Sequence, residues 1–391
     1  MRRSEDRILT THVGSLPRPK ALTSLYARRV RGEAVDLETI EGAAEVAVAE
    51  VIRRQIECGI DIINNGEQPR ESFVLYLRHR LTGLGGVSLR PMSADIEKYP
   101  SFKDVFTGRA TGKEAVSNRD QLPAAVGEVT YSDPKLVERE CRQFRGALDR
   151  VGDGFVEPFF TAPSPGIVAT IVQNRHYDTF ERYLDALGKA LQVEYEAIVG
   201  SGFVLQLDCP DLALERHTAF QDEPLGKFIG FAETVIATIN EALVNVPKDR
   251  VRLHACWGNY EGPHDCDVPM EEILPTIMEA KVGGFVLPLA NPRHAHEHRA
   301  LAKYPLKDDQ VLVAGVIDTV TNFVEHPEVV AERLERISHA VGDPTRVIAG
   351  TDCGFDTSAG MGDVAEDVVW AKLRSLAEGA KIASLRLFSP R

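Results

Sequence analysis

Short apolar runs recur along the whole chain, and helical patterns separate most of them. The runs end in Gly, Asp, Asn or Pro, as buried parallel strands do. Eight runs can be read, at residues 8–15, 60–67, 155–160, 203–208, 251–256, 284–289, 310–318 and 346–353. Repeated strand–helix units require parallel pairing, because each helix returns the chain to the start of the next strand. The sequence therefore predicts a closed (β/α)8 barrel whose strands all end at one rim.

Amphipathic helical patterns support the same architecture. They cover residues 37–58, 179–199, 228–243, 327–341 and 367–382, and glycines follow several of them at the position of a helix C-cap. The structural rival is an open doubly wound sheet, which usually carries a glycine-rich phosphate loop after its first strand. Residues 13–19 contain one glycine and two prolines and make a poor phosphate cradle. This pattern favours the barrel.

One long segment, residues 82–153, interrupts the alternation between the second and third predicted strands. It is polar, and Gly, Pro and Ser occur throughout it. We expect it to form an ordered, lid-like insertion over the barrel mouth. All 391 residues are expected to form a single domain, 1–391, and the insertion is part of it.

The composition excludes several classes of function. Hydrophobic residues make up 43% of the chain and charged residues 26%, as in ordinary globular proteins. The formal net charge of −13 disfavours binding to nucleic acid or to an anionic membrane surface. No apolar run approaches the roughly 20 residues that span a bilayer, and residues 1–7 are charged, unlike a secretory signal. Six scattered cysteines do not form a disulfide framework, so we expect a cytoplasmic protein.

One histidine and two cysteines lie at predicted strand ends. His254 and Cys256 are two residues apart, so on a strand their side chains face the same side. Cys353 ends the last run. Each could simply be a buried core residue, as free cysteines often are. Because barrel active sites lie at the carboxyl ends of the strands, and thiolates and imidazole are preferred zinc ligands, we predict a Zn²⁺ site there.

Carboxylates follow three other predicted strands. Glu67, Asp208 and Asp318 each stand at a run end and therefore at the same rim; any one of them alone would be read as a solvated charge. A zinc ion held by two thiolates is a poor Lewis acid for water but suits an incoming substrate thiol, which loses its proton on the metal. Such a site favours alkyl transfer to sulfur.

Five sequence motifs together resemble a known family. They are residues 10–17, Asn65-Gly66-Glu67, Gln206-Leu207-Asp208, residues 254–264 and residues 350–355. In combination these motifs are similar to the catalytic domain of cobalamin-independent methionine synthase, and still more to relatives that include epoxyalkane:coenzyme M transferase. The resemblance covers nearly the whole chain and implies a zinc-dependent transferase barrel.

The resemblance also implies roles for individual residues. His254, Cys256 and Cys353 would hold zinc, while Ser15, Glu67 and Asp208 would bind the thiol substrate, the two carboxylates by contacting its amine. Asp318 would act on the donor side. Trp257, which follows a zinc ligand, is expected either to wall the pocket and stack on a planar donor or to pack in the core.

Two departures from the family concern the fourth ligand and the alkyl donor. Residues 285–293 contain no carboxylate where methionine synthases supply a glutamate ligand, and Glu297 is the nearest candidate. Val320 stands close after Asp318, where methionine synthases carry a histidine thought to protonate the leaving nitrogen of the folate. A tertiary amine leaves poorly without a proton donor. The donor is therefore left open between a methylfolate-like molecule and an epoxide.

Some polar residues are expected to have no role in the site. His294, His296 and His298 are interpreted as a solvated loop or helix start. Arg18, Arg70 and Arg293 could bind an anion, but each is interpreted as a solvated or salt-bridged side chain. Three hypotheses follow: a methionine-synthase-like thiol S-methyltransferase, an epoxide-opening thiol transferase, and a non-catalytic zinc-binding homologue.

Overall fold

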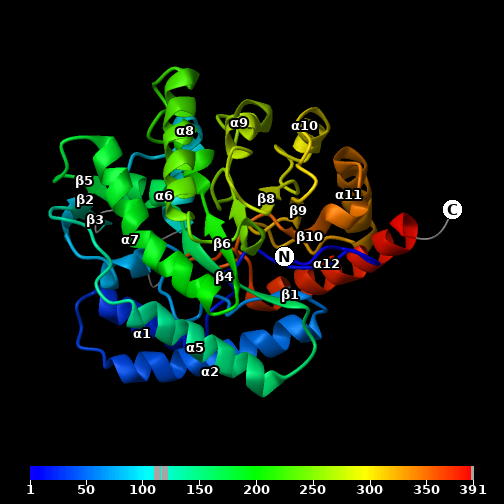
Figure 1. The fold of residues 1–391 in the computed structure, drawn as a ribbon, viewed down its shortest axis with the longest axis horizontal. Coiled ribbons are helices and arrows are strands. Elements are labelled where there is room, and N and C mark those ends of the chain that lie inside the picture. Colours follow the sequence, from blue (N-terminus) through cyan, green and yellow to red (C-terminus); the bar gives the residue numbers. More distant parts are fainter. Residues whose placement is uncertain (110–115, 117–121, 389–391) are drawn as a thin grey trace.

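A parallel sheet of seven strands forms the centre of the molecule (Figure 1). The computed structural model describes residues 1–109, 116 and 122–388. The sheet order is β1-β4-β6-β7-β8-β9-β10. The strands are β1 (Ile62–Ile63), β4 (Glu157–Pro163), β6 (Val204–Asp208), β7 (Val251–His254), β8 (Gly284–Pro288), β9 (Val311–Ile317) and β10 (Val347–Thr351). Each overlaps one of the second to eighth predicted runs, so those strand predictions are confirmed.

Helices surround this sheet on its outer side (Figure 1). They are α1 (Lys20–Val30), α2 (Leu37–Glu57), α5 (Lys135–Val151), α6 (Pro165–Ile171), α7 (Phe180–Gly200), α8 (Leu225–Ala242), α9 (Met270–Ile277), α10 (Ala300–Lys303), α11 (Pro327–Val341) and α12 (Glu366–Leu387). Short 3-10 turns are η1 (Leu75–His79), η3 (Pro210–Leu212), η4 (Leu214–His217), η5 (Lys248–Arg250), η6 (Glu297–Arg299) and η7 (Pro344–Arg346). Local signals explain several ends: Asp36 caps α2 and Thr179 caps α7 through their side chains, and Gly342 ends α11 in the left-handed conformation.

The N-terminal segment lies between the two edge strands of the sheet. Thr10 forms a single parallel bridge to Ala349 of β10, and its carbonyl accepts N–H groups from Asp61 and Ile62 at β1. The predicted strand at residues 8–15 is wrong as a regular strand. The amide of Val13 donates to the side-chain hydroxyl of Thr351 at 3.1 Å, and this bond interrupts the backbone ladder.

The interior of the curled sheet holds a small apolar core of its own. It comprises Leu9, Val13, Ile62, Phe159, Val204, Val286, Val311, Val313 and Ile348. These residues come from both edge strands, from the central strands and from the N-terminal segment. A flat sheet could not bring its two edges into one cluster, so the sheet curls around this core. A larger core lies between the sheet and the outer helices.

The segment 82–153 contains regular structure where it is described. It includes β2 (Leu84–Ser88), α3 (Ala94–Lys98), α4 (Pro100–Arg109) and β3 (Leu122–Ala125), and it ends in α5. Strands β2 and β3 are antiparallel and, with β5 (Gln173–Asn174), form a separate three-stranded sheet. Helix α5 packs beside α2 in the outer layer, with ion pairs from Arg139 and Arg150 to α2. Residues 110–115 and 117–121 of the segment lie outside the described residues. Its role as one lid unit remains a prediction.

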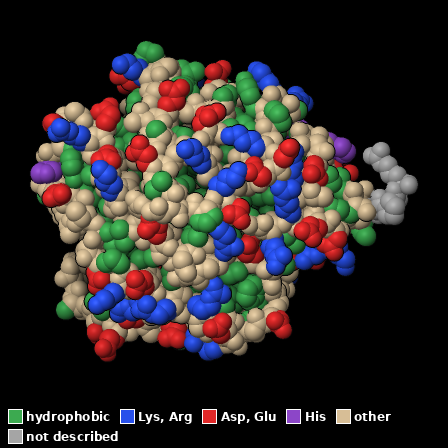
Figure 2. All heavy atoms as spheres, viewed as in Figure 1, with side chains coloured by type: hydrophobic (Ala, Val, Ile, Leu, Met, Phe, Trp, Pro, Cys, Tyr) green, Lys and Arg blue, Asp and Glu red, His purple; other side chains and the backbone are tan. Residues whose placement is uncertain are grey.

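The surface mixes both signs of charge. On the face in Figure 2, basic and acidic side chains are interspersed. Among the described helices, none has the length and apolar character needed to cross a membrane.

Candidate active site

The three predicted zinc ligands converge at the carboxyl end of the sheet. His254 ends β7, Cys256 follows it by two residues, and Cys353 follows β10. The Sγ atom of Cys353 lies 3.9 Å from Nε2 of His254, and the ligand atoms of all three residues lie within 4.8 Å of one another. Strands β7 and β10 are three steps apart in the sheet, which in a flat sheet would separate them by about 14 Å. The curl of the sheet therefore assembles this cluster.

Hydrogen bonds orient the His254 ring within the cluster. Its Nδ1 lies 3.1 Å from Oδ1 of Asp208, at the end of β6. The same oxygen accepts a bond of 2.8 Å from Gln206. Nε2 faces Cys353 and lies 3.2 Å from the carbonyl of Asp352. A carboxylate on the outer nitrogen of a histidine is the usual support for a metal-binding imidazole.

The charges of the cluster are strongly coupled. A hydrogen bond from Cys353 and the positive His254 ring hold the pKa of Cys256 well below its usual range, although burial opposes this. Burial also disfavours a charged His254, but the Cys256 thiolate and Asp208 outweigh it and raise the pKa of His254 to about 10. The hydrogen bond to Cys256 and burial raise the pKa of Cys353. One thiolate is thus already favoured in the metal-free protein, and thiolate is the form that binds metal.

The predicted substrate-binding residues line one pocket with this cluster. A cavity of about 170 Å³ has Ser15, Glu67 and Asp208 on its walls together with His254, Cys256 and Cys353. Apolar side chains and one cation complete it: Val13, Phe73, Ile167, Ile171, Pro210, Leu214 and Arg90. The pocket therefore offers sulfur ligands, two carboxylates and an apolar wall to one small molecule.

Glu67 presents an unpaired oxygen in this pocket. Its Oε1 accepts a bond of 2.9 Å from Thr161, whereas Oε2 is buried without a hydrogen-bond partner. Burial and the nearby Asp208 raise the pKa of Glu67 to about 7. Its backbone φ of +55° is a strained conformation for a residue other than glycine. A buried, unpaired carboxylate is suited to receive a positively charged group from a ligand.

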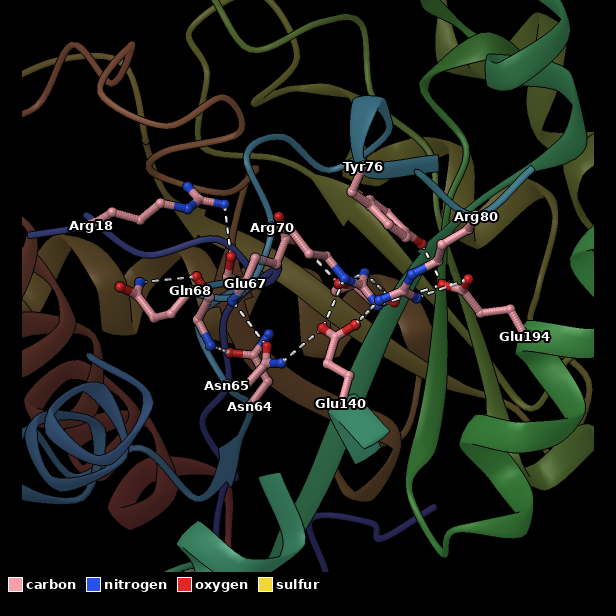
Figure 3. Close-up of polar contacts among 12 residues, drawn as sticks. Arg18, Asn64, Asn65, Glu67, Gln68, Arg70, Tyr76, Arg80, Glu140 and Glu194 are labelled. Carbon is pink, nitrogen blue, oxygen red and sulfur yellow. Dashed lines mark hydrogen bonds and ion pairs between the residues drawn. The ribbon is translucent and has the colours of Figure 1, made fainter. Parts of the chain in front are cut away.

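A buried network of charged residues supports the Glu67 loop (Figure 3). Arg18 donates to the carbonyl of Glu67 at 2.9 Å. Arg70 donates to Glu140 at 2.9 Å and to the carbonyl of Thr161, the residue that binds Glu67, at 2.8 Å. The remaining members are Asn65, Tyr76, Arg80, Tyr131 and Glu194. The sequence suggested only that Arg18 and Arg70 were solvated or salt-bridged; both are fully buried ion-pair members.

Ser15 is held against the strand end that carries Cys353. Its carbonyl accepts the amide of Phe355 at 2.9 Å, and its hydroxyl accepts the amide of Asp356 at 3.3 Å. A Cβ atom added to Gly354 would lie 2.1 Å from the Ser15 hydroxyl. A side chain at position 354 would therefore have to displace the Ser15 hydroxyl.

A second pocket shares Cys256 and Cys353 with the first. Trp257 and Asp318 line it, as do Asn259, Tyr260, His264, His294 and Val320. Trp257 is buried, donates to the carbonyl of Val268 at 2.7 Å and stacks on His294 with ring centroids 3.9 Å apart. Oδ1 of Asp318 accepts the amides of Val320 and Thr321 at 2.9 and 2.8 Å, so part of this carboxylate holds a turn.

The structure does not bring Glu297 to the sulfur ligands. Its Oε1 accepts the amide of Met270 at 2.9 Å, and its Oε2 lies 2.8 Å from Nδ1 of His294. The expectation that His294 is solvated is wrong, because its side chain is 5% exposed. Asp352, which sequence reasoning missed, binds the loop after β8 by accepting the amides of Leu289, Ala290 and Asn291. Its position directly before Cys353 was the available signal.

Known proteins similar to this chain include methionine synthases. A family model described as cobalamin-independent synthase, catalytic domain, matches residues 8–124. The resemblance found in the motifs is confirmed: the chain is similar to the cobalamin-independent methionine synthases, which are transferases.

Particular relatives match over nearly the full chain. The methionine synthase of Sulfolobus acidocaldarius is 28% identical over 349 residues, covering 88% of this chain and 85% of the relative. The methionine synthase of Saccharolobus solfataricus is 25% identical over 376 residues, covering 95% and 94%. A B12-independent methionine synthase from Shewanella sp. W3-18-1, solved in complex with selenomethionine, shares the fold with a TM-score of 0.70 at 20% identity, covering 97% of this chain and 99% of that one.

Proposed function

We propose that this chain transfers a methyl group to the sulfur of a small amine-bearing thiol, with zinc held by His254, Cys256 and Cys353. The observation that carries the proposal is the convergence of an imidazole and two thiols in a pocket that also contains Glu67 and Asp208. The proposal includes the (β/α)8 reading of the fold, with the N-terminal segment as its eighth member.

The donor atoms fit zinc. The set is one nitrogen and two sulfurs, as in zinc sites that bind a further ligand. The outer nitrogen of His254 is already engaged by Asp208, which leaves Nε2 toward the sulfurs. Bound there, zinc would lower the pKa of a substrate thiol and favour its thiolate at neutral pH. The fourth position would then belong to the substrate, since Glu297 is engaged elsewhere.

The protein's own groups would position the acceptor. Glu67 Oε2 and Asp208 would accept hydrogen bonds from the substrate ammonium group, and Ser15 would lie beside it. The strained Glu67 loop and the buried network behind it would hold the carboxylate in place before the substrate arrives, which lowers the entropic cost of alignment. Two carboxylates disfavour an acceptor that carries a sulfonate, because like charges repel in a buried pocket.

The donor would approach from the side of Trp257 and Asp318, whose pocket of about 30 Å³ would have to widen to admit it. Trp257 offers an aromatic wall near Cys256, and Asp318 one carboxylate oxygen. Val320 lines this pocket without a proton to donate. That observation favours a donor that needs no protonation of its leaving group, such as a cationic methyl donor, and it keeps epoxide opening as the second candidate.

Metal analysis and thiol assays test the proposal. The full chain should bind zinc stoichiometrically, and Cys256→Ser and Cys353→Ser should each lose it, whereas Cys266→Ser, a cysteine outside the cluster, should retain it. Consumption of homocysteine should exceed that of coenzyme M, with methylfolate and epoxides compared as donors. Zinc retained in both serine variants would exclude the site. Zinc binding with no thiol consumed with any donor would favour a non-catalytic homologue.

A further inference from the structure

A second cluster of histidine and carboxylate side chains lies next to Trp257. His264 Nδ1 and His294 Nε2 both contact Oδ2 of Asp267, at 2.8 and 2.7 Å. These three side chains are 2–5% exposed, and their ligand atoms lie within 4.8 Å of one another. His264 and Asp267 belong to the loop after β7, and His294 to the loop after β8. No step of the proposed thiol chemistry acts through these three residues, although His264 and His294 line the pocket on the donor side.

The outer nitrogen of each imidazole is already bound. Nε2 of His264 lies 3.0 Å from the carbonyl of Tyr260. Nδ1 of His294 lies 2.8 Å from Glu297, whose other oxygen accepts the amide of Met270. Metal-binding histidines nearly always present the outer N–H to a carboxylate or a carbonyl in this way. The inner nitrogens of both rings therefore have the orientation of ligands around a shared centre near Asp267.

The cluster holds two imidazole rings against shared carboxylates. Both nitrogens of each ring face an acceptor, and the two rings lie 6.2 Å apart with Asp267 and Glu297 as the facing carboxylates. In addition, Oδ1 of Asp267 and Nδ1 of His217 form a buried ion pair at 2.9 Å, and neither atom has a hydrogen-bond partner. A divalent ion would replace the two inner protons and could take these two atoms as further ligands.

We propose that His264, Asp267 and His294 bind a divalent transition-metal ion, with His217 within reach as a further donor. Two ligands each about 2.1 Å from a tetrahedral ion lie about 3.4 Å apart, so the contacts of 2.8 and 2.7 Å here would have to lengthen by about 0.6–0.7 Å. Nitrogen ligands with one carboxylate suit zinc, cobalt or nickel, whereas magnesium and calcium prefer oxygen. The ion would fasten the loop after β7 to the loop after β8. It would thereby fix His294 and the Trp257 ring stacked on it, beside Cys256.

A cobalt titration tests this site apart from the sulfur site. Cobalt bound to thiolate absorbs strongly in the near ultraviolet by charge transfer from sulfur, whereas cobalt bound to nitrogen and oxygen does not. Metal-free full chain should bind two equivalents of Co²⁺, only one with the charge-transfer band. The double variant His264→Gln, Asp267→Asn should lose the equivalent without the band and keep the other. His296→Gln, an exposed histidine of the same segment, should keep both.

The remaining outcomes are decisive for one site or the other. A single equivalent in the wild type, carrying the band, would overturn the second site. A double variant that still binds the equivalent without the charge-transfer band would also overturn the second site. The charge-transfer band retained in this variant would show that it is folded. In Cys256→Ser, Cys353→Ser the band should vanish while one equivalent remains. A further outcome is that the wild type binds one equivalent of Co²⁺ that shows no charge-transfer band and that the double variant loses. That result would support the second metal site and contradict the proposed function.

Discussion

Replacing Glu67 by glutamine should stabilise the metal-free protein at alkaline pH and not at acidic pH. Burial and Asp208 raise the pKa of this carboxyl from 4.5 to about 7 in the folded protein. The folded state therefore favours the protonated form, and wild-type stability from this group is greatest below pH 4.5. It falls as the pH rises toward 7, because ionisation is easier in the unfolded chain.

The size of the effect follows from the shift. Each pKa unit corresponds to 1.36 kcal/mol, so ionised Glu67 costs the folded protein about 3 kcal/mol above pH 7. Glutamine has nearly the same shape, keeps an oxygen for the Thr161 hydroxyl and carries no charge. The free energy of unfolding of Glu67→Gln minus that of the wild type should thus rise by about 2.5 kcal/mol between pH 5 and pH 8.

Urea unfolding at a series of pH values measures this difference. The metal-free protein is required, since a nearby divalent ion would itself favour the carboxylate. Glu233→Gln, at an exposed position, should run parallel to the wild type across the range. If Glu67→Gln also runs parallel, or if its advantage grows toward acid, the carboxylate is not destabilised by burial and the reasoning fails. Substrate assays should show the opposite trend: loss of a charge-assisted hydrogen bond worth about 1.5–3 kcal/mol should raise KM for the amine-bearing thiol about 10- to 150-fold.

Other perturbations test the support around the site. Arg70→Met leaves Glu140 and Glu194 with fewer partners and should lower the free energy of unfolding by about 3–5 kcal/mol. The control Arg139→Met breaks an exposed ion pair and should lower it by less than about 1 kcal/mol. Urea unfolding of both variants measures the difference. Gly354→Ala should displace the Ser15 hydroxyl and reduce kcat/KM with little loss of zinc. Steady-state kinetics and metal analysis of the same preparation check this. Unchanged kinetics would show that the position of the Ser15 hydroxyl does not matter for the reaction. Removal of metal by chelation should lower Tm, since ions that bind only the native state stabilise it; an unchanged Tm in calorimetry would argue against both metal sites.

Much of the site could be predicted because it depends on strand ends. Apolar runs of strand length, each followed by a turn residue, located seven strands, and the parallel pairing that their helices require places all their ends at one rim. Spacing of two residues on a strand was enough to bring Cys256 beside His254. Cys353 could be added because it ends another run, although nearly a hundred residues separate it from Cys256 along the chain.

Other features depend on contacts that no local pattern encodes. His294 stands in a polar stretch typical of a solvated loop, and only the fold brings it under Trp257 and against Asp267. Arg70 and Glu194 are 124 residues apart, and each alone looks like a surface charge. The first run pairs with β10 through a single bridge at Thr10, and beyond it Val13 donates to the side-chain hydroxyl of Thr351 rather than to a backbone carbonyl.

The sequence by itself thus determined which residue types stand at the rim of a parallel sheet, since the alternation of strands and helices is a local property of the chain. Only the tertiary structure decided how far the sheet curls, which closes a separation of about 14 Å to one within 4.8 Å for the sulfur and imidazole ligands. It also decided which polar residues are buried together, because burial depends on distant segments packing over them. That is the physical reason why the cluster of His254, Cys256 and Cys353 could be predicted from the sequence and the Asp267 cluster could not.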